Sequence, residues 1–174
     1  RKGKIADVDE EKVIWQFLLC SDFLQNAGYE HYEISNFALS GNYSKHNSAY
    51  WKGGHYLGAG PSAHSFNGHS RQWNVSSIQK YILQVRGGEN FFEKEELSEA
   101  EQCNEYIFTA LRTMWGIDLK LIQNRFGKNI TDHLLTASHS IEKRGLIKIE
   151  SDRIKLTREG KLFTDSISTD LMID

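Results

Sequence analysis

The stretch "ITDHLLTASHSIEKRGLIKIESDRIKLT", residues 130–157, decides the fold of the second half of the chain, because a helix pattern runs directly into a hairpin pattern. In its first part, apolar and small residues return at the spacing of one helix face, at Leu134, Leu135, Ala137, Ser138 and Ile141. In its second part, strand residues flank Ser151 and Asp152, which favour a tight turn. We therefore expect a helix followed at once by a two-stranded hairpin.

Further helices are predicted on both sides of this stretch. Ser98 and Glu101 have the spacing of a capping box, in which each side chain satisfies the backbone N–H of the other residue at the start of a helix. A short second helix is predicted over residues 118–127, and a closing helix from Thr157. Three helices, a hairpin and a closing helix predict a small, mostly helical, winged-helix-like domain over residues 93–174.

The first part of the chain has a helix, a glycine and then a strand, the order typical of an α/β layer. Residues 10–27 have the apolar spacing of the helix. Asp7 or Asp9 can accept hydrogen bonds from its first N–H groups, and Gly28 can end it in a left-handed conformation. Residues 29–35 then form the predicted strand.

Shorter patterns follow before the second domain. Residues 55–60 are a second strand candidate, and Asn74 can cap a helix that runs to about Val85. Residues 91–97 are expected to be a linker. The predicted fold class is therefore α/β over residues 1–92, followed by the winged-helix-like domain.

Composition and charge argue against several classes of protein. The formal net charge is −2, and the segment from Ser98 onward has 11 Lys and Arg against 12 Asp and Glu. A nucleic-acid-binding domain should instead carry a basic face that neutralises several phosphates. No apolar run approaches the roughly 20 residues that span a bilayer. The chain begins with Arg1 rather than methionine, so we expect a portion of a longer protein.

The two cysteines, Cys20 and Cys103, lie far apart in helix-like patterns. Free cysteine is among the most buried residue types. We therefore expect both to be small core hydrophobes in a reduced, cytoplasmic protein. Their spacing predicts neither a zinc site nor an iron–sulfur site.

Three histidines, His46, His55 and His64, lie in residues 44–66, which contain no carboxylate to complete a zinc site. We expect His55 and His64 to be structural. His46 differs because aromatic residues follow it closely, and a histidine in such a setting can offer a ring nitrogen to a porphyrin iron. The neighbours concerned are Asn47, Tyr50 and Trp51. Small residues that let a backbone approach a bulky ligand follow: Gly58, Gly60 and Ala63.

Four motifs in series point to a family. They are "YEISNFA" at 32–38, "HNSAYW" at 46–51, "YLGAGPSAHSF" at 56–66 and "RQWN" at 71–74. In this order the chain resembles the C-terminal half of the oxygen-independent coproporphyrinogen III oxidase-like proteins, which are radical S-adenosylmethionine (SAM) proteins. The His-Asn-x-x-Tyr-Trp motif resembles the haem chaperone branch. The resemblance covers nearly the whole chain, because the family also ends in a small winged-helix-like domain.

The resemblance implies the C-terminal part of an incomplete (β/α) radical SAM barrel, which places its ligands at the carboxyl ends of its strands. Residues 32–38 would be a late barrel strand and its following loop. The residues implied to lie near SAM are Phe37 and Ala38, with Gly58, Gly60 and Ala63 on the next strand and loop of the same cavity. His46 would hold the haem iron, supported by Asn47, Tyr50 and Trp51.

The implied function is haem binding and transfer to a recipient protein, in haem and porphyrin metabolism. Two alternatives stay open at this stage. One is oxidative decarboxylation of coproporphyrinogen III to protoporphyrinogen IX, and the other is a winged-helix module that docks on protein or DNA. The His-Asn-x-x-Tyr-Trp motif favours haem transfer over decarboxylation, and the charge balance argues against DNA binding.

The chain departs from the family in one respect that concerns its chemistry. The family holds its 4Fe–4S cluster with a Cys-x3-Cys-x2-Cys run, which this chain lacks. SAM cleavage needs an electron from that cluster, so we expect this chain alone to be inactive as a radical enzyme. The implied partner is the N-terminal half of the barrel. A barrel cut open has unpaired strand edges, so self-association is also expected.

Overall fold

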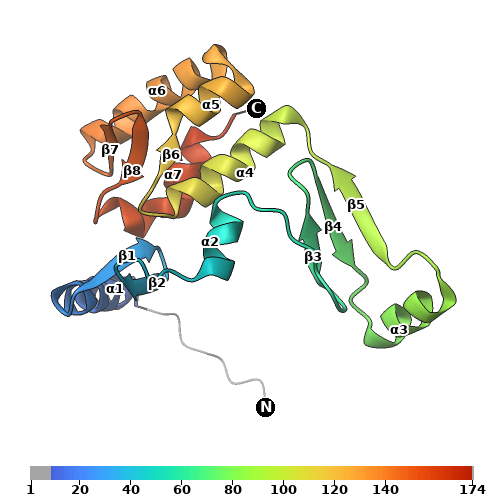
Figure 1. Ribbon diagram of the computed structural model, residues 1–174. Helices are drawn as coiled ribbons and strands as arrows, with labels where there is room; N and C mark the ends of the chain where they lie inside the picture. The colour runs from blue at the N-terminus through green and yellow to red at the C-terminus, as the bar shows by residue number, and fades with distance from the viewer. Residues whose placement is uncertain (1–8, 174) are drawn as a thin grey trace. The chain divides into compact units, whose positions relative to one another are not determined.

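The computed structural model describes residues 9–173, so the predicted cap Asp7 lies outside the described residues. It divides into two compact units, the first ending at Ser44 and the second beginning at Lys45 (Figure 1). Each unit is described by itself. Within residues 9–173, no helix is long and apolar enough to cross a membrane.

The first unit consists of helix α1 (Glu10–Asn26) and a hairpin of β1 (Tyr29–Glu33) and β2 (Asn36–Leu39). The predicted helix is confirmed. The Asp9 side chain accepts a hydrogen bond from the Lys12 N–H at 3.3 Å, which caps the helix. Gly28 has φ 87°, a left-handed conformation that favours glycine.

The "YEISNFA" motif forms an antiparallel hairpin rather than one strand and a loop. His31 pairs with Phe37 and Glu30 pairs with Ala38. The chain reverses because the Glu33 carboxylate, which is 2% exposed, accepts hydrogen bonds from the Ser35 N–H and the Asn36 side chain. Phe37 and Ala38 therefore lie on β2, and the rings of His31 and Phe37 stack with centroids 4.0 Å apart.

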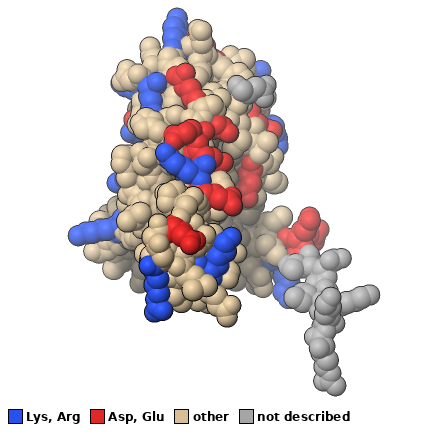
Figure 2. Space-filling model, turned by 90° about the vertical axis from the view of Figure 1, so that its right-hand side faces the viewer, with Lys and Arg blue, Asp and Glu red and all other residues tan. Residues whose placement is uncertain are grey.

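The second unit begins with α2 (Lys45–Trp51) and a three-stranded antiparallel sheet, in the order β3-β4-β5. Its strands and the helix between β4 and β5 are β3 (His64–Phe66), β4 (Ser70–Asn74), α3 (Ile78–Gly87) and β5 (Phe92–Glu96). On the face that Figure 2 shows, basic and acidic side chains are interspersed, in keeping with the small net charge.

Three local predictions in this region are wrong. Residues 55–60 are not a strand, because only Tyr56 forms an isolated bridge, to Phe66. The predicted linker at 91–97 contains β5, which pairs with β4 although α3 separates the two strands in the sequence. Asn74 ends β4, and the cap of α3 is Ser77, whose hydroxyl accepts the Lys80 N–H at 3.4 Å.

The winged-helix-like arrangement is confirmed. Three helices precede the hairpin β7–β8, the short strand β6 between the first two helices completes a sheet in the order β6-β8-β7, and a last helix closes the module. The elements are α4 (Glu99–Leu111), β6 (Ile117–Asp118), α5 (Leu119–Phe126), α6 (Lys128–Lys143), β7 (Ile147–Glu150), β8 (Arg153–Leu156), the 3-10 helix η1 (Gly160–Phe163) and α7 (Thr164–Leu171).

The local signals in this module are confirmed with one exception. The capping box of Ser98 and Glu101 is present, and the turn residues Ser151 and Asp152 have φ of 48° and 64°. The closing helix does not start at Thr157, because the Thr157 hydroxyl donates to the Gly145 carbonyl at 2.8 Å and accepts the Gly160 N–H at 3.0 Å. These bonds hold the chain in a turn until η1 begins.

The core of the second unit lies inside this module. Fully buried residues from α4, α5, α6, α7 and the sheet form one cluster, with Ile107, Leu111, Ile122, Leu134 and Leu171 each completely inaccessible. The end of the chain is tied to α4, because the Asn104 amide donates to the Ile173 carbonyl at 2.8 Å and accepts the Ile173 N–H at 2.9 Å. The predicted domain boundary between residues 92 and 93 stays a prediction.

We predict that Gly160→Ala destabilises the module. A Cβ at Gly160 would meet the backbone carbonyl of Leu146, which cannot move freely because it accepts the Thr157 N–H and belongs to a buried residue just before β7. Overpacking of this kind costs roughly 1–3 kcal/mol, measured as the loss in the free energy of unfolding by urea denaturation with circular dichroism.

The matched control is Gly87→Ala at the end of α3. A Cβ there makes only an ordinary contact, 3.6 Å from the Glu89 side chain. Alanine is also the better helix former by about 0.5–1 kcal/mol. Equal losses in the two variants would contradict the close approach of η1 to Leu146.

Candidate functional site

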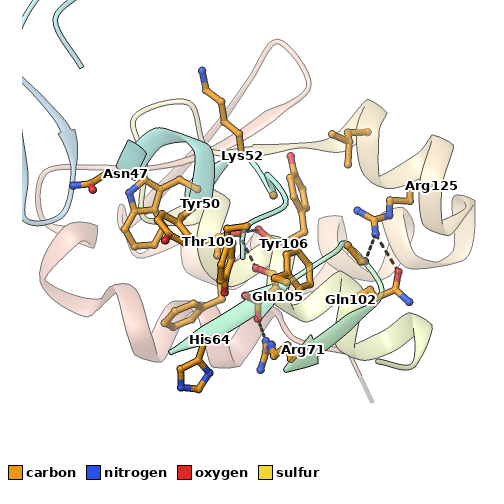
Figure 3. A pocket seen from close by; sticks show the side chains of 17 residues that line it. Asn47, Tyr50, Lys52, His64, Arg71, Gln102, Glu105, Tyr106, Thr109 and Arg125 are labelled. Carbon is orange, nitrogen blue, oxygen red and sulfur yellow. Dashed lines mark hydrogen bonds and ion pairs between the residues drawn. The ribbon is translucent and has the colours of Figure 1, made fainter. Parts of the chain in front are cut away.

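A cavity of about 640 Å³ lies within the second unit, and we call it the α2 cavity. Residues of α2, of the β3–β4 strands, and of α4 and α5 line it (Figure 3). The lining residues include Asn47, Tyr50, Trp51, Lys52, Tyr56, His64, Phe66, Arg71, Gln102, Glu105, Tyr106, Phe108, Thr109 and Arg125.

Helix α2 places its motif residues by simple helical spacing. Residues four apart lie on one face of a helix, and the rings of His46 and Tyr50 accordingly meet edge to face with centroids 4.9 Å apart. Tyr50 and Trp51 both line the cavity, as does Asn47. The motif therefore gives one exposed histidine beside an aromatic wall.

His46 itself is exposed and is not one of the cavity-lining residues. Among residues 9–173, no hydrogen bond involves its ring nitrogens. A neutral imidazole with an available nitrogen is the form of histidine that binds iron. The aromatic ring that meets the His46 ring is that of Tyr50.

Trp51 anchors α2 to the helical module. The guanidinium carbon of Arg112, the residue after α4, lies 5.8 Å from the centre of the Trp51 ring. Arg112 also forms an ion pair with Asp165 at 3.1 Å. The Trp51 Nε1–H is buried and has no acceptor among the described residues. A buried donor without a partner costs free energy.

The aromatic wall continues from α2 to the sheet. The Tyr50 and Tyr56 rings meet with centroids 4.5 Å apart, and the Tyr56 and Phe66 rings lie 6.1 Å apart. Burial raises the pKa of Tyr56, and the nearby Tyr50 raises it further against the opposing effect of Arg71. The Tyr56 hydroxyl therefore stays neutral at physiological pH and can donate a hydrogen bond.

Charged side chains come from both sides of the cavity. Arg71 of β4 forms an ion pair with Glu105 of α4 (Figure 3). Arg125 of α5 donates to the Gln102 side-chain oxygen at 3.0 Å and to the Gly68 carbonyl at 3.3 Å. The Lys52 ammonium lies 4.7 Å from the centre of the Trp115 ring.

The sequence did not identify these charged residues as site residues, although Arg71 belongs to the "RQWN" motif. Arg71 and Glu105 are 34 positions apart, and Arg125 and Gly68 are 57 apart. No local pattern brings them together, because their meeting depends on the packing of the sheet against α4 and α5. His64, which we expected to be structural, is exposed and also lines the cavity.

The predicted SAM residues are held by contacts within the protein. Ala38 is 9% exposed on β2, beside Phe37. Asn74 donates to the Gly58 and Gly60 carbonyls at 3.2 and 2.9 Å, and a Cβ at Gly58 would meet the backbone of His64. Gly58, Gly60 and Ala63 do not line the α2 cavity. Their place in a SAM cavity with Phe37 and Ala38 stays a prediction.

The expectation for the cysteines is half right. Cys103 is fully buried in α4, but Cys20 is exposed on α1, because this face of the helix also exposes Leu19 and Phe23. Burial raises the pKa of the Cys103 thiol to about 11. Among residues 9–173, no group of three or more His, Cys, Asp or Glu side chains could hold a metal ion.

We predict that the two thiols react at very different rates. At pH 8 the Cys103 thiol is neutral, because its pKa of about 11 lies well above that pH, and it is also shielded from reagent. Titration with a chromogenic disulfide should therefore release one equivalent of chromophore rapidly, from Cys20. The second equivalent, from Cys103, should appear only in denaturant. Cys20→Ser should remove the rapid equivalent, and a rapid second equivalent would contradict the burial of Cys103.

Comparisons with known proteins agree on one family. Residues 97–163 match the HemN C-terminal domain. The chain is 29% identical over 168 residues to the heme chaperone HemW of Bacillus subtilis, covering 96% of the chain and 44% of that protein. It is 37% identical over 191 residues to the mitochondrial radical S-adenosyl methionine domain-containing protein 1 of Danio rerio, covering 99% of the chain and 41% of that protein.

A solved structure has the same fold. The coproporphyrinogen III oxidase HemN from Escherichia coli, a radical SAM enzyme, matches with a TM-score of 0.68 at 20% identity. The match covers 88% of the chain and 39% of that enzyme. The chain thus spans less than half the length of each of these three proteins.

Proposed function

Because the chain belongs to the HemN-like radical SAM family, as its C-terminal portion, we propose that it binds haem at α2 and takes part in passing haem to a recipient protein. The observation that carries the proposal is the exposed His46 ring, edge to face with Tyr50 beside the aromatic α2 cavity. The name heme chaperone of the Bacillus subtilis relative supports the same function.

The residues of α2 have separate roles in this proposal. His46 supplies the ring nitrogen that binds the iron. Tyr50 limits the rotation of the His46 ring, because the two rings are in contact. Trp51 fixes α2 against Arg112, and Asn47 lies at the cavity edge. The exposure of His46 suits transfer, because a recipient protein can reach the iron from solvent.

SAM and a 4Fe–4S cluster belong to the proposal only for a HemN-like protein that has a complete barrel. Phe37, Ala38, Gly58, Gly60 and Ala63 are the residues that we propose for SAM contact in that setting. The cysteines do not fit a cluster, since Cys20 and Cys103 lie in different units and Cys103 is buried. The alternative reaction, decarboxylation of coproporphyrinogen III, needs such a cluster and is therefore the weaker proposal for this chain.

Exposed apolar residues on α1 support a partner surface. Trp15, Leu19 and Phe23 are 61, 51 and 70% exposed. We propose that this face is covered by the N-terminal barrel half that the relatives have in addition, or by a second copy of the chain in its absence.

The two free thiols are in keeping with a reduced compartment such as the cytoplasm.

His46→Ala should weaken haem binding about tenfold or more, since even the loss of a supporting residue at a metal site costs about 10- to 100-fold. The measurement is a Soret titration of the chain with haem. The matched control is His55→Ala, which removes an exposed histidine of the same segment that does not line the cavity. An unchanged Soret titration in His46→Ala would contradict the assignment of His46 as the iron ligand.

Anaerobic treatment of the chain with iron, sulfide and SAM should give no iron–sulfur absorbance and no 5′-deoxyadenosine. The physical reason is the lack of three cysteines that can meet at one cluster. The Escherichia coli coproporphyrinogen III oxidase, treated in parallel, serves as the positive control. Formation of either product by this chain would show that other side chains can replace the cysteine run.

A further inference from the structure

The α2 cavity has an excess of positive charge. Its lining contains three cationic side chains, Lys52, Arg71 and Arg125, and one carboxylate, Glu105. Arg71 and Glu105 pair with each other. Lys52 and Arg125 form no ion pair with any described residue. Two positive charges thus remain for an anionic ligand.

The walls of the same cavity suit a flat, apolar body. Six aromatic residues line it: Tyr50, Trp51, Tyr56, Phe66, Tyr106 and Phe108. Aromatic rings offer large apolar faces against which a planar ligand packs. The cavity therefore combines stacking surfaces with positive charge.

The two cations are held differently. Arg125 is fixed by its bonds to Gln102 and to the Gly68 carbonyl, both of which are neutral acceptors that leave its charge uncompensated (Figure 3). A guanidinium held in this way can grip a carboxylate with two parallel hydrogen bonds. Lys52 rests on the Trp115 ring and is exposed, so its ammonium can swing toward a ligand.

We propose that the α2 cavity binds a flat apolar ligand with two carboxylates, which Arg125 and Lys52 hold. The identity of this ligand rests on the proposed function, under which it is a tetrapyrrole with two propionates. A tetrapyrrole with four carboxylates fits the cavity less well. Its two additional negative charges would have no partner in Arg125 or Lys52, and Glu105 adds a like charge to the same lining.

The test uses metal-free porphyrins, so that it does not depend on iron binding by His46. The chain is titrated with protoporphyrin IX, its dimethyl ester and coproporphyrin III, which have two, no and four carboxylates, and porphyrin fluorescence is measured. Protoporphyrin IX should bind most tightly, and its affinity should fall as salt is added, because the contacts are ionic. Equal binding of the dimethyl ester would overturn the proposal.

Variants then identify the carboxylate partners. Arg125→Gln should weaken protoporphyrin IX binding about tenfold, because it removes a guanidinium that two hydrogen bonds hold in place. Lys52→Gln should weaken it about threefold, because Lys52 supplies a single ammonium on a flexible side chain. Neither should change binding of the dimethyl ester. The matched control is Lys120→Gln on the same helix as Arg125, which removes the same charge from a residue outside the cavity lining. An equal loss in Lys120→Gln, or unchanged affinity in both cavity variants, would overturn the proposal.

Arg125→Lys keeps the positive charge but cannot form the two parallel hydrogen bonds, so it should recover only part of the affinity lost in Arg125→Gln. If circular dichroism shows that Arg125→Gln does not fold, Arg125→Lys and Lys52→Gln serve as the test variants. The metal-free porphyrin separates this proposal from the proposed function, because it has no iron for His46 to bind. If His46→Ala leaves the haem titration unchanged while Arg125→Gln weakens the metal-free porphyrin, the iron ligand is wrong and the carboxylate site stands.

Discussion

The ion pair of Arg71 and Glu105 is the contact on which the second unit's cavity depends. Arg71 comes from β4 and Glu105 from α4, so the pair joins the antiparallel sheet to the helical module. The bonds of Arg125 to the Gly68 carbonyl and to Gln102 strengthen the same junction from α5. Because these contacts are polar, they position the sheet without filling the space between it and the helices, and that space remains open as the cavity.

The parts of the fold that the sequence predicted correctly are those with local signals. The Asp9 cap, the capping box of Ser98 and Glu101, and the turn at Ser151 and Asp152 each depend on residues within a few positions of each other. The buried positions Leu134, Ser138 and Ile141 of α6 follow from helical spacing in the same way, but the prediction is wrong for Leu135, which is exposed.

The errors concern structure that depends on distant residues. The strand β5 reads "FEKEE". Four of its five residues are charged and exposed, so its sequence has no alternation of apolar and polar residues. Its partner β4 lies beyond a whole helix, so only the pairing itself makes it a strand. For the same reason the motif on α2 could be found from the sequence, whereas Arg71, Glu105 and Arg125, which the packing assembles around it, could not.

The link between Asn104 and Ile173 has a consequence for how the protein is made. These residues are 69 positions apart, and α7 packs against α4 through buried residues. During synthesis α4 leaves the ribosome long before α7, so its buried face stays without part of its partner until α7 has been made. The module therefore completes its folding only after α7 has emerged, and until then the apolar face of α4 is open to chaperones.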